Sequence, residues 1–348
     1  MEERDLDYIV GVLKGEPAGE PEDWYAVLGF LFRHRVAGLF CSRANRQGVP
    51  LPKRAERLLS GAFEAQKRRV RGMRREIAEI SEALERKGVR YVLLKGSLLA
   101  NAPEGLRVYE DGERASEDID VLLRPDGITG AEEALKELGF VQGVWRKERD
   151  ILPFSRAEVL KRRMNRGETA PFVRLTGDPE RPFLEVDLNF SLGNTPSEGG
   201  GLLEEMISAG RVYEGEIRVR APDREMFFLH LLLHQYKESC LGFMAERGKD
   251  LELYKLADLY YLSRRRAFDW VRLDEKIREY GLESRAGAVL HQVGAIFRDE
   301  EFLGLAKAYG EEQPLVIDYE RKRQYYWTAP ERARICRWDG RCFLAEVE

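Results

Sequence analysis

The spacing of the apolar residues changes abruptly at Val89. Before it, apolar residues recur at three, four or seven positions, which is the period of an amphipathic helix: Leu59, Phe63, Val70, Met73, Ile77, Ile80 and Leu84. Gly88 then stands where a helix C-cap is expected. After Val89 the chain contains short runs rich in branched residues, such as "VRYVLLKG", which are typical of strands. The change predicts a helical region followed by a domain that mixes strands and helices.

Further segments define the extent of this domain. "EDIDVLLRP" has the pattern of a strand, "GAEEALKELGF" that of an amphipathic helix, and "PFLEVDLNFSL" alternates apolar and polar residues as a half-buried strand does. After "APDRE" the helical pattern returns, with Asp223 as the expected N-cap. We therefore expect an α+β protein in three parts: a helical region over 1–86, a core with a small mixed sheet over 87–220, and a helical region over 221–348.

Composition limits the classes of function. The 348 residues hold 57 Lys and Arg against 61 Asp and Glu, a net charge of -4, which argues against a protein that mainly coats nucleic acid. Four scattered cysteines without a CxxC pair disfavour a structural zinc site. The amino terminus lacks an apolar signal core, and no apolar run reaches the ~20 residues that cross a bilayer. We expect a cytoplasmic protein without membrane contact.

Two acidic residues, Asp118 and Asp120, begin the "EDIDVLLRP" strand. Residues two apart on a strand project from the same face, ~6.6 Å apart along the chain, so the two carboxylates repel each other unless a cation lies between them. Mg²⁺ is the natural ion, because it binds carboxylate oxygens together with substrate phosphate. Most such triplets are ordinary solvent-facing acids, so the pair alone is a weak signal. A third acid on the later strand strengthens it: Asp187 is our choice and Glu185, on the same face, is its rival.

The turn before the acids, Lys95-Gly96-Ser97, could bind an anion. Gly96 would let the backbone pass close to a phosphate, Ser97 offers a hydroxyl and an amide, and the start of a helix favours negative charge. Lys95 would add a positive charge. The alternative is a plain strand-to-helix turn with a solvated lysine. The tetrapeptide "VLKG" also occurs at 12–15, without a helix or an acid pair after it, so only the context of the second copy is informative.

The chain contains, in order, a strand, a Gly-Ser turn, the start of a helix, a strand with D-x-D and a later strand with an acid. In this order it resembles the polymerase-β nucleotidyltransferase superfamily. It is more closely similar to a bacterial family of uncharacterised nucleotidyltransferases. The features of that family are an "LLKG" turn, an R-x-x-x-D-I-D-x-L strand and a helix ending in Gly-Phe or Gly-Tyr; the matching segments are "LLKGSLLA", "RASEDIDVLL" and "EEALKELGF". The resemblance implies a polymerase-β-like core. It also implies metal-dependent transfer of a nucleoside monophosphate from a nucleoside triphosphate, such as ATP, to an acceptor hydroxyl, with release of pyrophosphate.

The resemblance also assigns residues. It implies two Mg²⁺ ions, or Mn²⁺, held by Asp118, Asp120 and Asp187. It implies that Gly96 and Ser97 hold the β and γ phosphates, that Arg114 pairs with phosphate or braces the loop, and that Lys95 belongs to the nucleotide site in a role left open. The acceptor is a small molecule, a protein side chain or an RNA end. The competing hypothesis is a non-catalytic nucleotide-binding sensor or scaffold, against which the presence of all the motif residues speaks.

The chain departs from the family pattern in two places. The span from Ser97 to Asp118 is longer than the superfamily minimum, and Asn189 stands where the family more often has histidine, so a role for that histidine is in doubt.

Four other groups have weaker claims. For His230 and His234, one helical turn apart, we favour structural histidines over a metal pair. Lys255 and Asp258 share a helical face and could touch the base or the acceptor. The basic runs 66–75 and 161–166 could approach phosphates, the second as a mobile loop that meets a triphosphate or an anionic acceptor, but we favour solvated runs for both.

Overall fold

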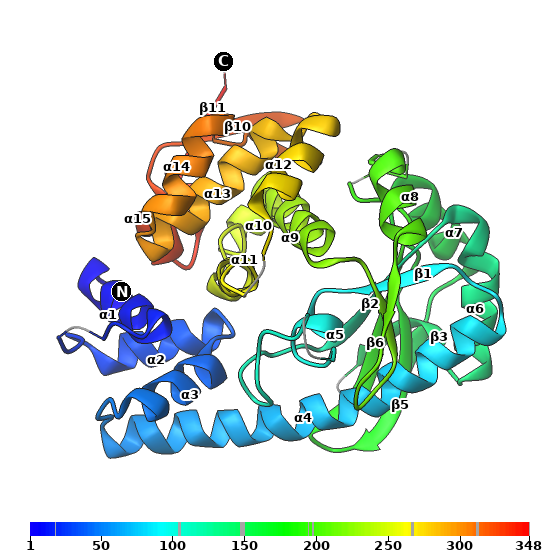
Figure 1. Ribbon diagram of the computed structural model, residues 1–348, viewed down its shortest axis with the longest axis horizontal. Coiled ribbons are helices and arrows are strands. Elements are labelled where there is room, and N and C mark those ends of the chain that lie inside the picture. The colour runs from blue at the N-terminus through cyan, green and yellow to red at the C-terminus, as the bar shows by residue number, and fades with distance from the viewer. Residues whose placement is uncertain are drawn as a thin grey trace. The chain divides into compact units, whose positions relative to one another are not determined.

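The computed structural model describes residues 1–17, 19–103, 106–146, 150–193, 195–196, 198–265, 268–310 and 313–347. It divides into two compact units (Figure 1). The first unit comprises Met1–Glu64 together with Phe228–Glu348, and the second comprises Ala65–Phe227. The predicted core over 87–220 falls within the second unit, while the division of the chain into three parts stays a prediction.

A six-stranded mixed sheet forms the centre of the second unit, in the order β1-β2-β6-β5-β3-β4. Strands β2 and β6 are parallel and the other neighbours are antiparallel. The strands are β1 (Tyr91–Leu94), β2 (Asp118–Leu123), β3 (Val141–Arg146), β4 (Asp150–Pro153), β5 (Phe172–Asp178) and β6 (Arg181–Asn189). The mixed sheet predicted from the alternating patterns is therefore confirmed.

Burial follows the sequence alternation in β6, whereas in β2 every residue from Ile119 to Leu123 is buried, Asp120 included. Ile119 and Val121 on β2, and Val186 and Leu188 on β6, are fully buried. The polar residues between them project from the opposite face, because successive side chains of a strand alternate. All four residues of β1 are buried, as expected for a strand covered on both faces.

Helices and one ribbon complete the second unit. The 65–86 part of α4 (Lys53–Arg86) belongs to it, and the predicted apolar stripe from Val70 to Leu84 is buried. The other elements are α5 (Gly96–Leu99), η1 (Pro125–Gly127), α6 (Ile128–Glu137), α7 (Arg156–Asn165), α8 (Gly200–Ser208), and the paired strands β7 (Arg211–Tyr213) and β8 (Val219–Ala221). Helix α8 packs against β1 and β2.

The first unit is mainly helical. It contains α1 (Glu3–Lys14), α2 (Trp24–Arg33), α3 (Ala37–Gln47), the start of α4, α9 (Arg224–Ser239) from Phe228 onward, α10 (Gly242–Glu246), α11 (Leu253–Ser263), α12 (Trp270–Glu279), α13 (Glu283–Phe297), α14 (Glu300–Tyr309) and α15 (Glu331–Ile335). Asp223 caps α9 as predicted, accepting the Met226 N–H at 3.0 Å.

The expectation of a purely helical carboxy-terminal region was incomplete. A three-stranded antiparallel sheet, in the order β11-β10-β9, is formed by β9 (Val316–Asp318), β10 (Arg323–Trp327) and β11 (Leu344–Glu346), with η2 (Gly340–Phe343) before the last strand. Strands of three to five residues are too short to show a period of two clearly, so local patterning does not reveal them.

A buried histidine connects the two sequence segments of the first unit. His34 Nδ1 accepts the Leu253 N–H at 3.2 Å, and its Nε2 lies 3.2 Å from the Ile335 carbonyl oxygen. Burial, reinforced by the nearby Arg33, lowers the pKa of His34 to about 3. The ring is therefore neutral, and donation from Nε2–H satisfies both contacts at once.

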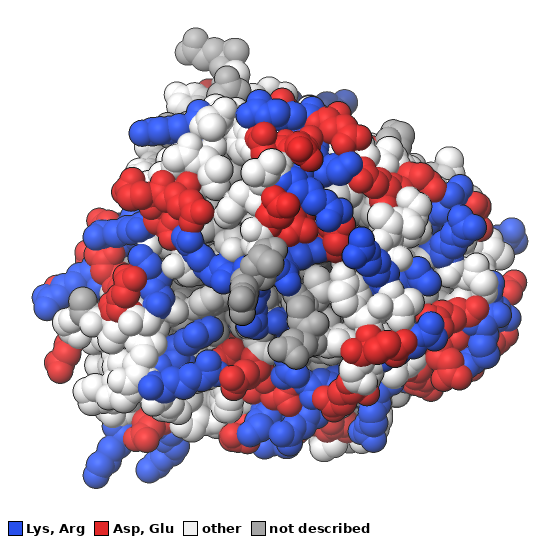
Figure 2. Space-filling model, viewed as in Figure 1, with Lys and Arg blue, Asp and Glu red and all other residues white. Residues whose placement is uncertain are grey.

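Basic and acidic side chains are intermixed over the face that Figure 2 shows, in keeping with the near-balance of 57 against 61 charged residues. Among the helices that the structure describes, none is both long and apolar enough to cross a membrane.

Candidate metal and nucleotide site

Three carboxylates meet where β2 and β6 lie side by side. The parallel register places Asp120 opposite Asp187 and Asp118 opposite Glu185. One carboxylate oxygen from each of Asp118, Asp120 and Asp187 lies within 4.8 Å of the others. Glu185 lies outside this cluster, so the geometry favours Asp187 over its rival as the third acid.

Burial makes the negative charge at this site costly. It raises the pKa of Asp187 well above its ordinary value, and the carboxylates of Asp120, Glu185 and Asp118 add to the effect by repulsion. Burial, followed by the charges of Asp118 and Asp120, also raises the pKa of Glu185 to about 7. Acidic groups arranged this way favour a bound cation or proton.

Lys95 supplies a positive charge from within the chain. Its Nζ lies 2.7 Å from Asp120 Oδ1, and the Asp120 side chain is only 3% exposed. Burial alone would lower the pKa of Lys95, but the carboxylates of Asp120 and Asp118 outweigh it and raise that pKa overall. The lysine is therefore charged in the absence of any other cation.

The backbone of Lys95 has an unusual conformation, with φ 51° and ψ -128°. Positive φ favours glycine, and a non-glycine residue there costs of order 1–3 kcal/mol. The sequence suggested Gly96 as the residue with special backbone freedom, whereas the positive φ belongs to Lys95.

Gly96 is needed for a different reason, which is close packing. A Cβ at this position would lie 2.1 Å from Ser116 Oγ. The helix expected after the turn is α5, of only four residues, so the field of its N-terminus is weak and anion binding here would depend on individual groups.

Ser97 and Arg114 occupy different surroundings. Ser97 is fully buried, and its Oγ has no hydrogen-bond partner among the described residues. Arg114 is 6% exposed; its Nη1 donates to the Ala115 carbonyl, and its own carbonyl accepts from Gln66 Nε2 at 2.9 Å. These contacts fit a residue that braces the loop before β2.

Residues 20–298 match the model of a family described as "Uncharacterised nucleotidyltransferase". This chain belongs to that family. No curated protein matches it, and neither does any solved structure. The family resemblance seen in the sequence is therefore confirmed, and nucleotidyl transfer is the activity the family description indicates.

Asn189 is a further polar residue at the site, and we did not predict its contacts there. Its Nδ2 lies 3.4 Å from Asp120 Oδ1 and 3.4 Å from the Asp187 carbonyl oxygen. It thus contacts a candidate metal ligand, Asp120, from the same strand that carries Asp187. The alternation of β6, which puts Asn189 on the same face as Asp187, was the available signal.

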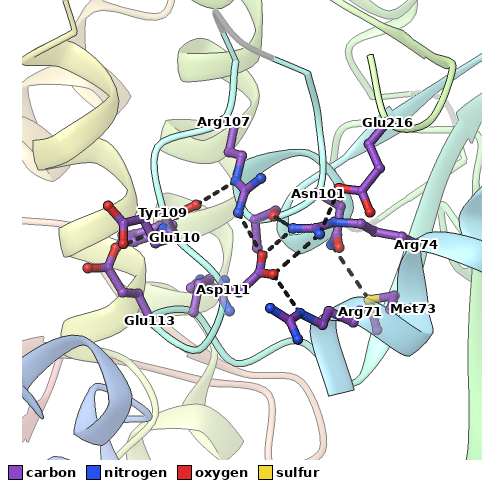
Figure 3. Close-up of polar contacts among 12 residues, drawn as sticks. Arg71, Met73, Arg74, Asn101, Arg107, Tyr109, Glu110, Asp111, Glu113 and Glu216 are labelled. Atoms are coloured by element: carbon purple, nitrogen blue, oxygen red, sulfur yellow. Dashed lines mark hydrogen bonds and ion pairs between the residues drawn. The ribbon is translucent and has the colours of Figure 1, made fainter. Parts of the chain in front are cut away.

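A second network fixes the connection between α5 and β2 (Figure 3). Asp111 contacts three arginines: Arg71 Nε at 3.2 Å, Arg107 Nη2 at 2.6 Å, and Arg74 through both terminal nitrogens. Burial would raise the pKa of Asp111, but the hydrogen bonds and charges of these arginines lower it overall. Arg74, in the run 66–75, is 5% exposed, so the prediction of a solvated basic face was wrong for this residue.

The remaining candidates on helices α9 and α11 belong to the first unit. In the helical unit, His230 and His234 have nearly parallel rings 6.3 Å apart, and His234 Nε2 lies 3.4 Å from Glu238 Oε1. Lys255 pairs with Glu238 and, at 2.8 Å, with Glu252.

The second basic run, 161–166, was predicted to be solvated, and this is confirmed, while the alternative of a mobile loop at this position was wrong. It belongs mostly to helix α7, which begins with a capping box between Ser155 and Glu158 and has no buried residue.

Proposed function

We propose that this protein is a metal-dependent nucleotidyltransferase with a polymerase-β-like core. It transfers a nucleoside monophosphate from a nucleoside triphosphate to an acceptor hydroxyl and releases pyrophosphate. The observation that carries the proposal is the cluster of Asp118, Asp120 and Asp187 on two parallel strands, next to the Lys95-Gly96-Ser97 turn. Membership of a nucleotidyltransferase family supports the same reaction class.

The donor set suits a hard divalent cation. Carboxylate oxygens are the ligands that Mg²⁺ and Mn²⁺ prefer, and three of them come within 4.8 Å of one another. Burial, followed by repulsion from neighbouring carboxylates, raises the pKa of Asp187, and a bound cation would offset both effects. Once bound, two such ions would polarise the α-phosphate and neutralise charge that develops on the leaving pyrophosphate.

The chain's own residues would bind, orient and accept a proton. Asp118 and Asp120 would hold the metal, with Asn189 fixing the Asp120 carboxylate. Asp187 would complete the ligand set or accept the proton of the attacking hydroxyl. Catalysis would then depend on positioning and charge neutralisation, without a covalent intermediate.

The triphosphate would lie at the turn that follows β1. Ser97 has a hydroxyl without a hydrogen-bond partner among the described residues, and Lys95 brings a positive charge. Gly96 would take part through its backbone, and the side chain of Ser116 packs against it. Arg114 would contribute by holding the loop before β2 in place. The acceptor is a small molecule, a protein side chain or an RNA end.

A product analysis tests the proposal. The protein is incubated with mixed nucleoside triphosphates, Mg²⁺ and a metabolite or RNA extract, and products are identified by mass spectrometry. We expect pyrophosphate together with an acceptor that has gained a nucleoside monophosphate. The Asp118→Asn and Asp187→Asn variants should form neither product. Calorimetry that detects Mg²⁺-dependent ATP binding, without transfer to any acceptor, would instead favour a nucleotide sensor.

A further inference from the structure

The candidate metal cluster already contains a cation that belongs to the chain. Lys95 Nζ donates to Asp120 Oδ1 at 2.7 Å, and Asn189 Nδ2 approaches the same oxygen at 3.4 Å. Asp120 is also one of the three residues whose oxygens converge. A carboxylate that is only 3% exposed has little room for further partners, so the ammonium and a metal ion would compete for it.

The backbone of Lys95 indicates that this contact is maintained at a cost. With φ 51° and ψ -128°, position 95 has a conformation that glycine would adopt without strain. A lysine there has its side chain directed at the carboxylates of the neighbouring strand β2. Strained residues of this kind persist where the surrounding structure enforces them, and they cluster at functional sites.

The charges at the site make the contact exchangeable. Asp118, Asp120 and Asp187 all attract the Lys95 ammonium, which lies 2.7 Å from Asp120 Oδ1, and Glu185 and Asp187 are in turn repelled by Asp118 and Asp120. One ammonium partly neutralises these acids, whereas a divalent ion at the converging oxygens would do so more fully and would repel the ammonium beside it. Lysine has a long flexible stem, and Ser97, a proposed phosphate contact, is only two residues away.

We propose that Lys95 is an exchangeable internal counterion, an inference that rests on the function proposed above. Its ammonium pairs with Asp120 while the cluster is free of metal, leaves when a divalent cation binds, and then pairs with the triphosphate of the incoming nucleotide. Metal binding therefore precedes and strengthens nucleotide binding. Without metal, the lysine is engaged and the acids repel the triphosphate.

The exchange is tested by titrating the protein with Mn²⁺ alone and measuring the free ion by electron paramagnetic resonance. If the lysine competes with the metal, Lys95→Met should bind Mn²⁺ more tightly, on the order of tenfold. The same variant, saturated with Mn²⁺, should bind a non-hydrolysable nucleoside triphosphate analogue more weakly, again on the order of tenfold. The matched control is Lys136→Met, which removes an exposed lysine paired with Glu132 on α6 and should change neither affinity.

Lys95→Met should change the two affinities in opposite directions, with tighter Mn²⁺ binding and weaker binding of the nucleotide analogue. This pattern distinguishes exchange of the lysine from a role in positioning the metal ligands. Weaker or unchanged Mn²⁺ binding in Lys95→Met would overturn the proposal, because it would mean that the lysine supports the ligand set or stays clear of it. Lys95→Gly, which removes the same charge and also relieves the positive φ, should repeat the tighter Mn²⁺ binding and guards against misfolding of the methionine variant.

Two further results separate this inference from the proposed function. Wild-type protein that binds no Mn²⁺, or Asp118→Asn and Asp187→Asn variants that bind it as well as wild type, would overturn both proposals. If wild type binds Mn²⁺ and the aspartate variants do not, but Lys95→Met binds it no more tightly than wild type, the metal site stands and only the role of Lys95 falls.

Discussion

Ser116 occupies the space that a side chain at position 96 would need. A Cβ on Gly96 would lie 2.1 Å from Ser116 Oγ and 2.7 Å from Ser116 Cβ. The Ser116 hydroxyl also lies 3.3 Å from the Asp118 carbonyl oxygen. The nucleotide turn and the start of the acidic strand are therefore packed directly against each other, and a change in one displaces the other.

The first prediction concerns this packing. Gly96→Ala should destabilise the protein by about 1–3 kcal/mol, because an overpacked buried position forces its neighbours to move. It should also weaken Mn²⁺ binding, since Asp118 follows Ser116 so closely. Chemical denaturation and metal titration measure the two effects.

A compensating change provides the control. Ser116→Gly removes both clashing atoms, so the double variant should recover part of the stability and of the metal affinity lost in Gly96→Ala. Additive losses in the double variant would show that the close approach is not the cause.

The second prediction concerns the acids. Asp187→Asn should raise the free energy of unfolding of the metal-free protein at pH 8 by about 1 kcal/mol, because burial and the neighbouring carboxylates oppose the ionisation of Asp187 in the folded state, and asparagine does not ionise. Its Mn²⁺ affinity should fall by at least about tenfold. Asp126→Asn, on a side chain 72% exposed, should change neither. Lower stability in Asp187→Asn would contradict the repulsion assigned to the cluster.

The third prediction concerns pH. Burial and the charges of Asp118 and Asp120 raise the pKa of Glu185 to about 7 from an ordinary 4.5. Its stabilising contribution is therefore fully present below pH 4.5 and is lost as the pH rises through 7. Glu185→Gln does not titrate, so its stability relative to wild type should increase over this window, by about 1–2 kcal/mol after allowance for partial exposure.

The comparison requires metal-free protein, because a bound cation would favour the ionised glutamate. The free energy of unfolding of wild type and of Glu185→Gln is measured against pH with a chelator present. Parallel profiles would refute the raised pKa of Glu185.

The sequence predicted the elements of this site better than the contacts between them. A period of two placed Asp118 with Asp120, and Glu185 with Asp187, on common faces, because alternation is a local property of a strand. It did not decide between Asp187 and Glu185, since that choice depends on the register between β2 and β6, which is a long-range property.

The features that were missed are also long-range. The positive φ of Lys95 and the space that Ser116 takes from Gly96 depend on how the turn packs against the chain before β2. Likewise, a basic helical run looks solvated in sequence, and only the fold brings an acid to Arg74. No local pattern distinguishes a buried arginine from an exposed one.

The last prediction tests that buried pair. Asp111 and Glu216 both contact Arg74 Nη1, at 3.3 Å and 2.9 Å, but the Asp111 side chain is 15% exposed and that of Glu216 is 68% exposed. Asp111→Asn should lower the free energy of unfolding by about 3 kcal/mol, because it leaves a buried guanidinium without its principal countercharge. Glu216→Gln, the matched control, should cost less than about 0.5 kcal/mol, since water screens its contact. Equal effects of the two substitutions in urea denaturation would show that burial does not determine the strength of this network.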